Sequence, residues 1–114
     1  MQNEHAGGLL VDCPTRFAVE IIADKWSVLV LFALGQRPRR HGELIEVIGG
    51  VSRKVLTHAL RRLQEYGLVD RRAQGRHVEY SLTPIGETLI EPIDALTSWA
   101  RDNGSAILDF QADA

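Results

Sequence analysis

The chain has 114 residues and a formal net charge of −2, and 45% of its residues are hydrophobic and 25% charged. These values are typical of one globular domain with its own core, and the longest apolar run, 28–34, is far shorter than the ~20 residues of a membrane-spanning helix. The single cysteine excludes an internal disulfide and favours a reducing cytoplasm.

The first predicted elements are two helices behind a polar tail. Residues 1–12 are expected to form a flexible tail without the features of a signal peptide. Pro14 suits the first position of a helix, along which Phe17 and Ile21 repeat at helical spacing. The next segment, DKWSVLVLFALG, is apolar almost all round, which predicts a buried helix that its final glycine ends. A buried strand is the alternative, because a short apolar run has no clear period.

The middle of the chain predicts two helices joined by a short turn. QRPRRH is expected to be a turn, and GELIEVIGG a short helix that the paired glycines end. Ser52 is a good N-cap for a helix from Arg53 to Tyr66, and Gly67 is the glycine expected after it. The apolar stripe of this helix comprises Leu56, Ala59, Leu60 and Leu63. Two helices with a glycine-containing turn between them are typical of a helix-turn-helix.

The last part of the chain predicts a hairpin and a long helix. LVDRRA and HVEYSL alternate apolar and polar residues around QGR, which is typical of a two-stranded hairpin. Thr83 and Pro84 begin a helix that is expected to run to about Asn103, where the following glycine ends it. Residues 104–114 are expected to be a tail. The sequence therefore predicts a mainly α domain, 13–103, with a small β-hairpin wing: a winged helix-turn-helix.

Charge is distributed unevenly along the chain. Ten basic and four acidic residues lie between Arg37 and Arg76, a balance of +6, whereas the rest of the chain has three basic and eleven acidic residues, a balance of −8. Such segregation favours a surface for a polyanion, with a merely solvated charged face as the alternative.

The polar face of the helix after Ser52 carries side chains suited to DNA. A major groove about 12 Å wide admits one helix, whose early side chains reach the base edges. Lysine and arginine can bind guanine or phosphate, and threonine and histidine can donate or accept hydrogen bonds. The hairpin arginines are expected on the DNA backbone or in the adjacent minor groove. The predicted DNA-binding residues are Ser52, Arg53, Lys54, Thr57, His58, Arg61, Arg71, Arg72 and Arg76.

A set of motifs occurs in order between Cys13 and Ala100. After the cysteine come 22–26 (IADKW, compare IGGKW), 40–44 (RHGEL, compare RFxEL), 51–68 (compare ISxKxLTxxLRxLExxGL), the intact VEYSLTxxG at 78–86, and Trp99. Together they resemble the HxlR family of bacterial winged-helix transcriptional regulators, relatives of the MarR type. Two departures stand out: His41 replaces the usual phenylalanine, and the wing turn lacks the proline common before VEY.

The resemblance implies a homodimer whose terminal helices pack across the two-fold axis. The last helix agrees with this, because its apolar face is longer than so small a core covers. The expected interface residues are Phe17, Ile93, Leu96 and Trp99. A dimer would bind a pseudo-palindromic operator with half-sites about 10–10.5 bp apart. Packing within one chain is the alternative.

Cys13 is a candidate redox or electrophile sensor. The start of a helix favours a thiolate, and an equivalent cysteine is such a sensor in some members of the resembled family. The carboxylate of Asp12 opposes this, and the chain has no second cysteine to resolve an oxidised one. A small buried hydrophobic residue is the alternative.

No motif predicts a metal site, a cofactor or an enzyme. The histidines lack metal-ligand spacing, and no catalytic constellation stands out. The expected partners are double-stranded DNA, a second copy of the chain and a small-molecule or electrophile inducer, without membrane contact, in a bacterial cytoplasm. The alternatives are a winged-helix module for an acidic protein partner and a sensor enzyme that uses Cys13.

Overall fold

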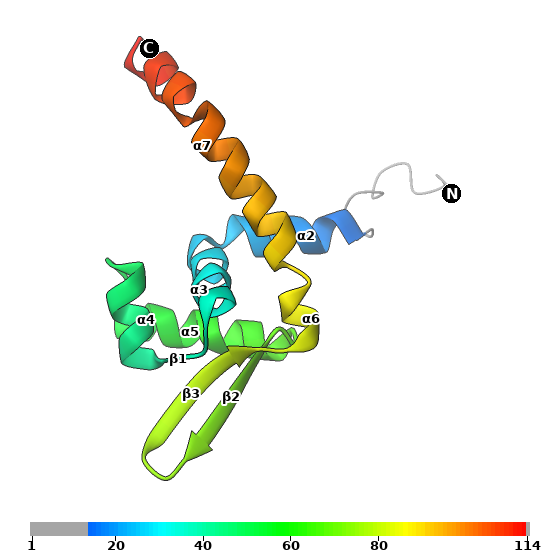
Figure 1. The fold of residues 1–114 in the computed structure, drawn as a ribbon, viewed down its shortest axis with the longest axis vertical. Helices are drawn as coiled ribbons and strands as arrows, with labels where there is room; N and C mark the ends of the chain where they lie inside the picture. The colour runs from blue at the N-terminus through cyan, green and yellow to red at the C-terminus, as the bar shows by residue number, and fades with distance from the viewer. Residues whose placement is uncertain (1–13, 114) are drawn as a thin grey trace.

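The computed structural model describes residues 14–113, so Cys13 lies outside the described residues. Its elements are α2 (Pro14–Ala23), α3 (Lys25–Gln36), β1 (Arg39–Arg40), α4 (His41–Ile48), α5 (Arg53–Glu65), β2 (Val69–Gln74), β3 (His77–Leu82), α6 (Pro84–Glu87) and α7 (Ile90–Ala112). The β2–β3 hairpin extends from one side of the helices, and α7 extends from the other (Figure 1). This arrangement confirms the predicted winged helix-turn-helix.

The core forms around α3, which contacts α2, α4, α5, α7 and β3. The strand alternative for 28–34 is wrong, because this segment lies inside α3 with Val30 and Leu31 completely buried. The predicted stripe of α5 is confirmed, since all four of its residues are buried. Packing of that stripe against α3 fixes which face of α5 points to solvent.

The caps of α5 follow the prediction. The Ser52 hydroxyl oxygen accepts a hydrogen bond from the Val55 amide at 3.1 Å, so Ser52 is the N-cap. Gly67 has a φ of 78°, and the Leu68 amide after it donates to the Leu63 carbonyl at 3.0 Å. A left-handed residue at this point ends a helix and turns the chain into the next element, here β2.

The expected turn QRPRRH contains a third strand. Arg39 and Arg40 form β1, which pairs antiparallel with Tyr80 and Glu79 and gives the strand order β1-β3-β2. A strand of two residues is too short to show alternation in the sequence. The Arg39 side chain is buried, and its guanidinium donates to the Ala33 carbonyl at 3.0 Å and to the Gln36 side chain at 2.6 Å. Arg39 therefore holds the end of α3 and is not part of a charged surface.

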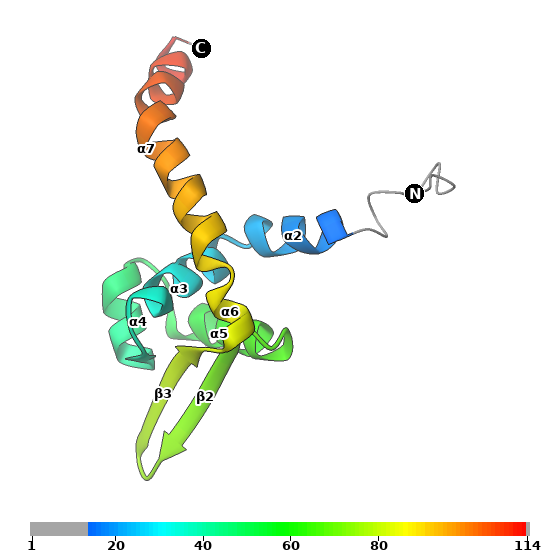
Figure 2. The ribbon, with the colours of Figure 1, turned by 45° about the vertical axis from the view of Figure 1, so that its right-hand side comes forward.

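The prediction of one helix from Pro84 to Asn103 is wrong in two respects: the segment is divided into two helices, and the second ends at Ala112. The structure has a short α6 and then α7, which begins at Ile90 (Figure 2). Pro92 accounts for the break, because it has no N–H for the Thr88 carbonyl and its ring would clash with that carbonyl in a continuous helix. In the first turn of a new helix, the same proline is tolerated.

Two glycines that were expected to end helices lie inside them. Gly104 is within α7, which continues to Ala112, so 104–112 is helical and not a tail. Gly35 is likewise within α3, which ends at Gln36. Neither has the positive φ of Gly67. A glycine in a helix costs about 1 kcal/mol relative to alanine, so its presence does not by itself end a helix.

Candidate nucleic-acid interface

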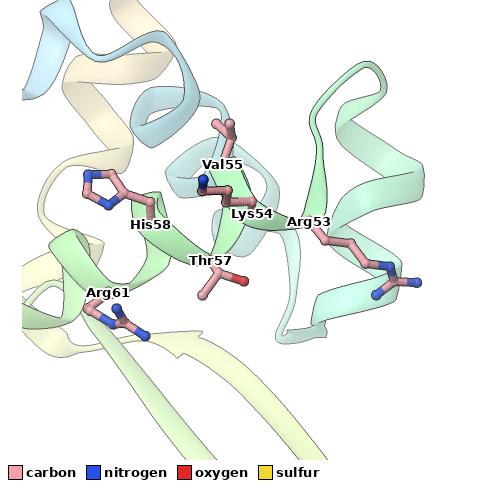
Figure 3. A pocket seen from close by; sticks show the side chains of 6 residues that line it. All are labelled: Arg53, Lys54, Val55, Thr57, His58 and Arg61. Atoms are coloured by element: carbon pink, nitrogen blue, oxygen red, sulfur yellow. The ribbon is translucent and has the colours of Figure 1, made fainter.

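The exposed face of α5 brings five predicted residues together. They line one shallow depression along the first three turns of the helix, with Val55 at its edge (Figure 3). Each of the five is exposed, whereas the opposite stripe of α5 is buried in the core. The helix is therefore fixed by its apolar side and free on its polar side. The five residues are Arg53, Lys54, Thr57, His58 and Arg61.

Ser52 is the exposed N-cap at the start of α5. Its oxygen is occupied by the Val55 amide, but its O–H remains available as a donor on the exposed N-cap. The amides of the first helical turn point the same way, and the positive end of the helix dipole lies there. A phosphate group fits such a position.

His41 contacts one of the residues of this exposed face of α5, which the sequence did not indicate. It is the first residue of α4, and its Nε2 lies 2.9 Å from the Thr57 hydroxyl oxygen. Partial burial and the positive charge of Arg53 lower the pKa of His41, against a hydrogen bond with the Arg53 backbone that raises it. The only sequence indication was a polar residue where the resembled family has phenylalanine.

Arg62 belongs to the fold and not to the exposed face. Its guanidinium lies 3.2 Å from an Asp24 carboxylate oxygen and 3.4 Å from the Tyr66 hydroxyl. Asp24 also caps α3, because it accepts from the Trp26 and Ser27 amides and from the Ser27 hydroxyl. The motif IGGKW has glycine at this position, whereas Asp24 of this chain links α3 to α5.

The hairpin places its two neighbouring arginines on opposite faces. Arg72 pairs with Glu79, which pairs on its other side with Arg40, so these three share one face. Arg71 pairs with Tyr80, which is buried in the core, so Arg71 lies on the face toward the helices. The outer face has a small depression lined by Arg40, Arg72, Gln74, His77 and Glu79.

Arg76 lies at the tip of the hairpin, as predicted. It follows Gly75, whose φ of 61° permits the tight turn between β2 and β3. The tip is the part of the wing farthest from the helices (Figure 1). Arg76 is therefore exposed and reaches beyond α5.

The four predicted interface residues lie on α2 and α7 and differ in their exposure. Phe17 on α2 is half exposed, and its ring packs edge-on against Tyr66 with centroids 5.0 Å apart. Ile93 is half-buried against the core, whereas Leu96 and Trp99 are exposed along α7. Between α2, α3 and the start of α7 lies an apolar cavity of about 240 Å³.

Residues 14–113 contain neither a metal cluster nor a helix suited to a membrane. No three His, Cys, Asp or Glu side chains in this range lie close enough together to hold a metal ion. None of the helices described combines the length and the apolar character needed to cross a membrane.

Comparisons with known proteins agree with the fold. Residues 21–107 match the family described as HxlR-like helix-turn-helix. The HTH-type transcriptional regulator YtfH of Escherichia coli strain K12 is 39% identical over 111 residues, which cover 94% of this chain and 88% of that protein. The solved structure of a transcriptional regulator ytfH from Salmonella typhimurium is 35% identical, with a TM-score of 0.78, over 89% of this chain and 93% of that one.

Two other similar structures are regulators that respond to redox chemistry or hold a quinone. The redox regulator HypR in its reduced form is 27% identical, with a TM-score of 0.79, over 85% of this chain and 99% of that one. The quinone-bound YodB of Bacillus subtilis is 28% identical, with a TM-score of 0.70, over 79% of this chain and 99% of that one.

Proposed function

This chain belongs to the HxlR-like helix-turn-helix family of transcriptional regulators, and from that premise we propose that it is a homodimeric repressor that binds a specific operator through α5. One observation carries this proposal: α5 is seated in the core by one face and presents five polar or basic side chains on the other. A helix held in this way can enter a major groove without loss of core packing.

The exposed residues of α5 have different tasks on the DNA. Lys54 and Arg61 supply cations that meet guanine acceptors or phosphates, and His58 donates or accepts at a base edge. Arg53 and Ser52, at the start of the helix, hold a phosphate and so set the register of α5 in the groove.

The wing contacts the neighbouring minor groove. A hairpin that lies along this groove has a phosphate backbone on either side. Arg71 and Arg72 point to opposite faces of the hairpin, so one can contact the phosphate backbone on each side of the groove. Arg76 at the tip enters the groove itself, where the negative potential of the DNA attracts arginine.

The dimer forms through α7 together with α2. No residue of α7 is buried, and Leu96, Trp99, Ile107, Leu108 and Phe110 are all exposed. The continuation of α7 to Ala112 adds the last three of these to the apolar surface that the sequence predicted. Burial of such side chains in a partner is what usually stabilises a small regulator as a dimer.

Selection of bound duplexes from a random library tests both parts of this proposal. We expect a pseudo-palindrome with half-sites about 10–10.5 bp apart, since a two-fold dimer places two α5 helices in successive major grooves. A single enriched half-site would contradict the dimer. Absence of any enrichment, together with capture of an acidic protein, would contradict DNA binding and support an interaction module.

Cys13 gives the regulator its response to oxidants or electrophiles. It immediately precedes α2, and similar structures include a redox regulator and a quinone-bound protein. With one cysteine per chain, an oxidised thiol must pair with Cys13 of a second subunit or with a small thiol. With a quinone, the thiolate would instead add to a ring carbon, and the ring would take up a proton and become a hydroquinone thioether.

Treatment with diamide or a quinone should lower the affinity of the wild type for its selected operator and leave Cys13→Ser unchanged. The reason is that a cysteine thiolate reacts with diamide and with quinones, whereas a serine hydroxyl does not. Affinity is measured by titration of a labelled duplex, before and after treatment. An equal response of wild type and Cys13→Ser would show that the cysteine is not the sensor.

A further inference from the structure

We propose that His41 is a positioning residue for DNA recognition: it holds the Thr57 hydroxyl toward α4, so that the Thr57 methyl group faces the DNA and selects a thymine. This inference rests on the proposed function, because it concerns the same face of α5. It assigns a role to the residue at which this chain departs from the motif RFxEL.

The contact joins the two helices of the helix-turn-helix. His41 begins α4 and Thr57 lies in the second turn of α5, so their 2.9 Å contact is not a local one along the chain. The start of α4 is itself fixed, because a Glu43 carboxylate oxygen accepts from the Arg40 amide at 2.8 Å. The imidazole is therefore held on a rigid support beside α5.

The orientation of threonine in a helix is a choice that a neighbour can decide. Thr side chains divide between two χ1 rotamers in helices, because the hydroxyl can also bond the backbone of the preceding turn. A hydrogen bond from another helix selects one of them. In Figure 3 the Thr57 oxygen and methyl group point in different directions from the same carbon, and Thr57 is exposed. With the oxygen held by His41, the methyl group is the part left free.

The surroundings of His41 disfavour its protonated form. Partial burial and the charge of Arg53 lower the pKa of His41, against a hydrogen bond with the Arg53 backbone that raises it. A neutral imidazole has one donor and one acceptor nitrogen and pairs readily with a hydroxyl. Its effect on DNA therefore passes through Thr57.

A methyl group and a hydroxyl contact bases differently. A threonine hydroxyl can hydrogen-bond to several base edges, whereas its methyl group makes an apolar contact with the C5-methyl of thymine. Phenylalanine at position 41 would fill the same space between α4 and α5 but accept no hydrogen bond. His41 thus restricts what Thr57 can contact.

The test replaces each thymine of the selected operator in turn by uracil, which lacks only the C5-methyl group. With the wild type, one thymine per half-site should lose about fourfold in affinity, the effect of one buried methyl group. His41→Phe should show no loss at that position and unchanged losses elsewhere. The double variant His41→Phe/Thr57→Val should again lose affinity when that thymine is replaced by uracil, because valine presents a methyl group in either orientation.

Other outcomes overturn the proposal and are distinct from failure of the proposed function. If His41→Phe keeps the wild-type uracil effect, His41 does not position Thr57. If His41→Phe lowers the affinity for every uracil-substituted operator by the same factor, the role of His41 is only structural. If the wild type selects no sequence at all, the proposed function itself fails, and circular dichroism of both variants verifies that each is folded.

Discussion

The double substitution Lys54→Ala/Arg61→Ala is expected to weaken the free energy of binding to the selected operator by about 2–6 kcal/mol. Each of the two residues supplies a contact of about 1–3 kcal/mol. Both side chains are exposed on α5, and neither forms an ion pair within residues 14–113. Their charges are therefore free for DNA. Their removal leaves the buried stripe of α5 untouched, so the fold should persist.

The same pair of substitutions should change the salt dependence of binding. The slope of log affinity against log salt should become less steep by about 0.9 for each phosphate that the protein no longer neutralises. Arg101→Ala is the control for loss of one positive charge elsewhere, since Arg101 is exposed on α7 and away from α5. Wild-type affinity and slope in the double variant would show that α5 does not contact the DNA through this face.

Gly86→Ala should be the most destabilising small substitution in the chain. An added Cβ would lie 2.1 Å from the Leu68 carbonyl oxygen, far inside van der Waals contact. That carbonyl cannot move away easily, because it accepts the Thr83 amide at 3.0 Å where β3 ends and α6 begins. Overpacking of this kind costs about 1–3 kcal/mol and sometimes more. The final glycine of VEYSLTxxG thus permits α6 to lie on the chain that enters the wing.

Urea unfolding at equilibrium measures the effect, with Gly42→Ala as the control. Gly42 is also helical, but an added Cβ there meets nothing within 4 Å and its φ is ordinary. Alanine should stabilise that position by up to about 1 kcal/mol, the difference in helix propensity. Equal free energies of unfolding for Gly86→Ala and the wild type would contradict the close approach to Leu68.

Elements set by local residues could be predicted from the sequence. The α5 helix has its N-cap at Ser52, its apolar stripe and its glycine at Gly67 within a short stretch, and all three were confirmed. The hairpin was also predicted, because its alternation and its glycine turn lie next to each other. The break at Pro92 was missed, although a proline four residues after Thr88 was visible in the sequence.

Contacts between distant residues could not be predicted. Thr57 is 16 residues from His41, and Arg62 is 38 residues from Asp24, and no periodicity links either pair. For the same reason the charge balance of the basic segment does not show which of its basic residues face solvent. Arg39 is buried, and Arg62 is partly exposed and paired with Asp24.

Recognition of the major groove by the exposed face of α5 is tested most directly by protection of guanine N7 from dimethyl sulfate in the bound operator. N7 is exposed only in the major groove. With the wild type, we expect protected guanines in both half-sites. Arg61→Ala, at concentrations that still saturate the duplex, should restore reactivity at one guanine per half-site and leave the others protected. Full occupancy without N7 protection, or the same protection with Arg61→Ala, would contradict recognition through the exposed face of α5.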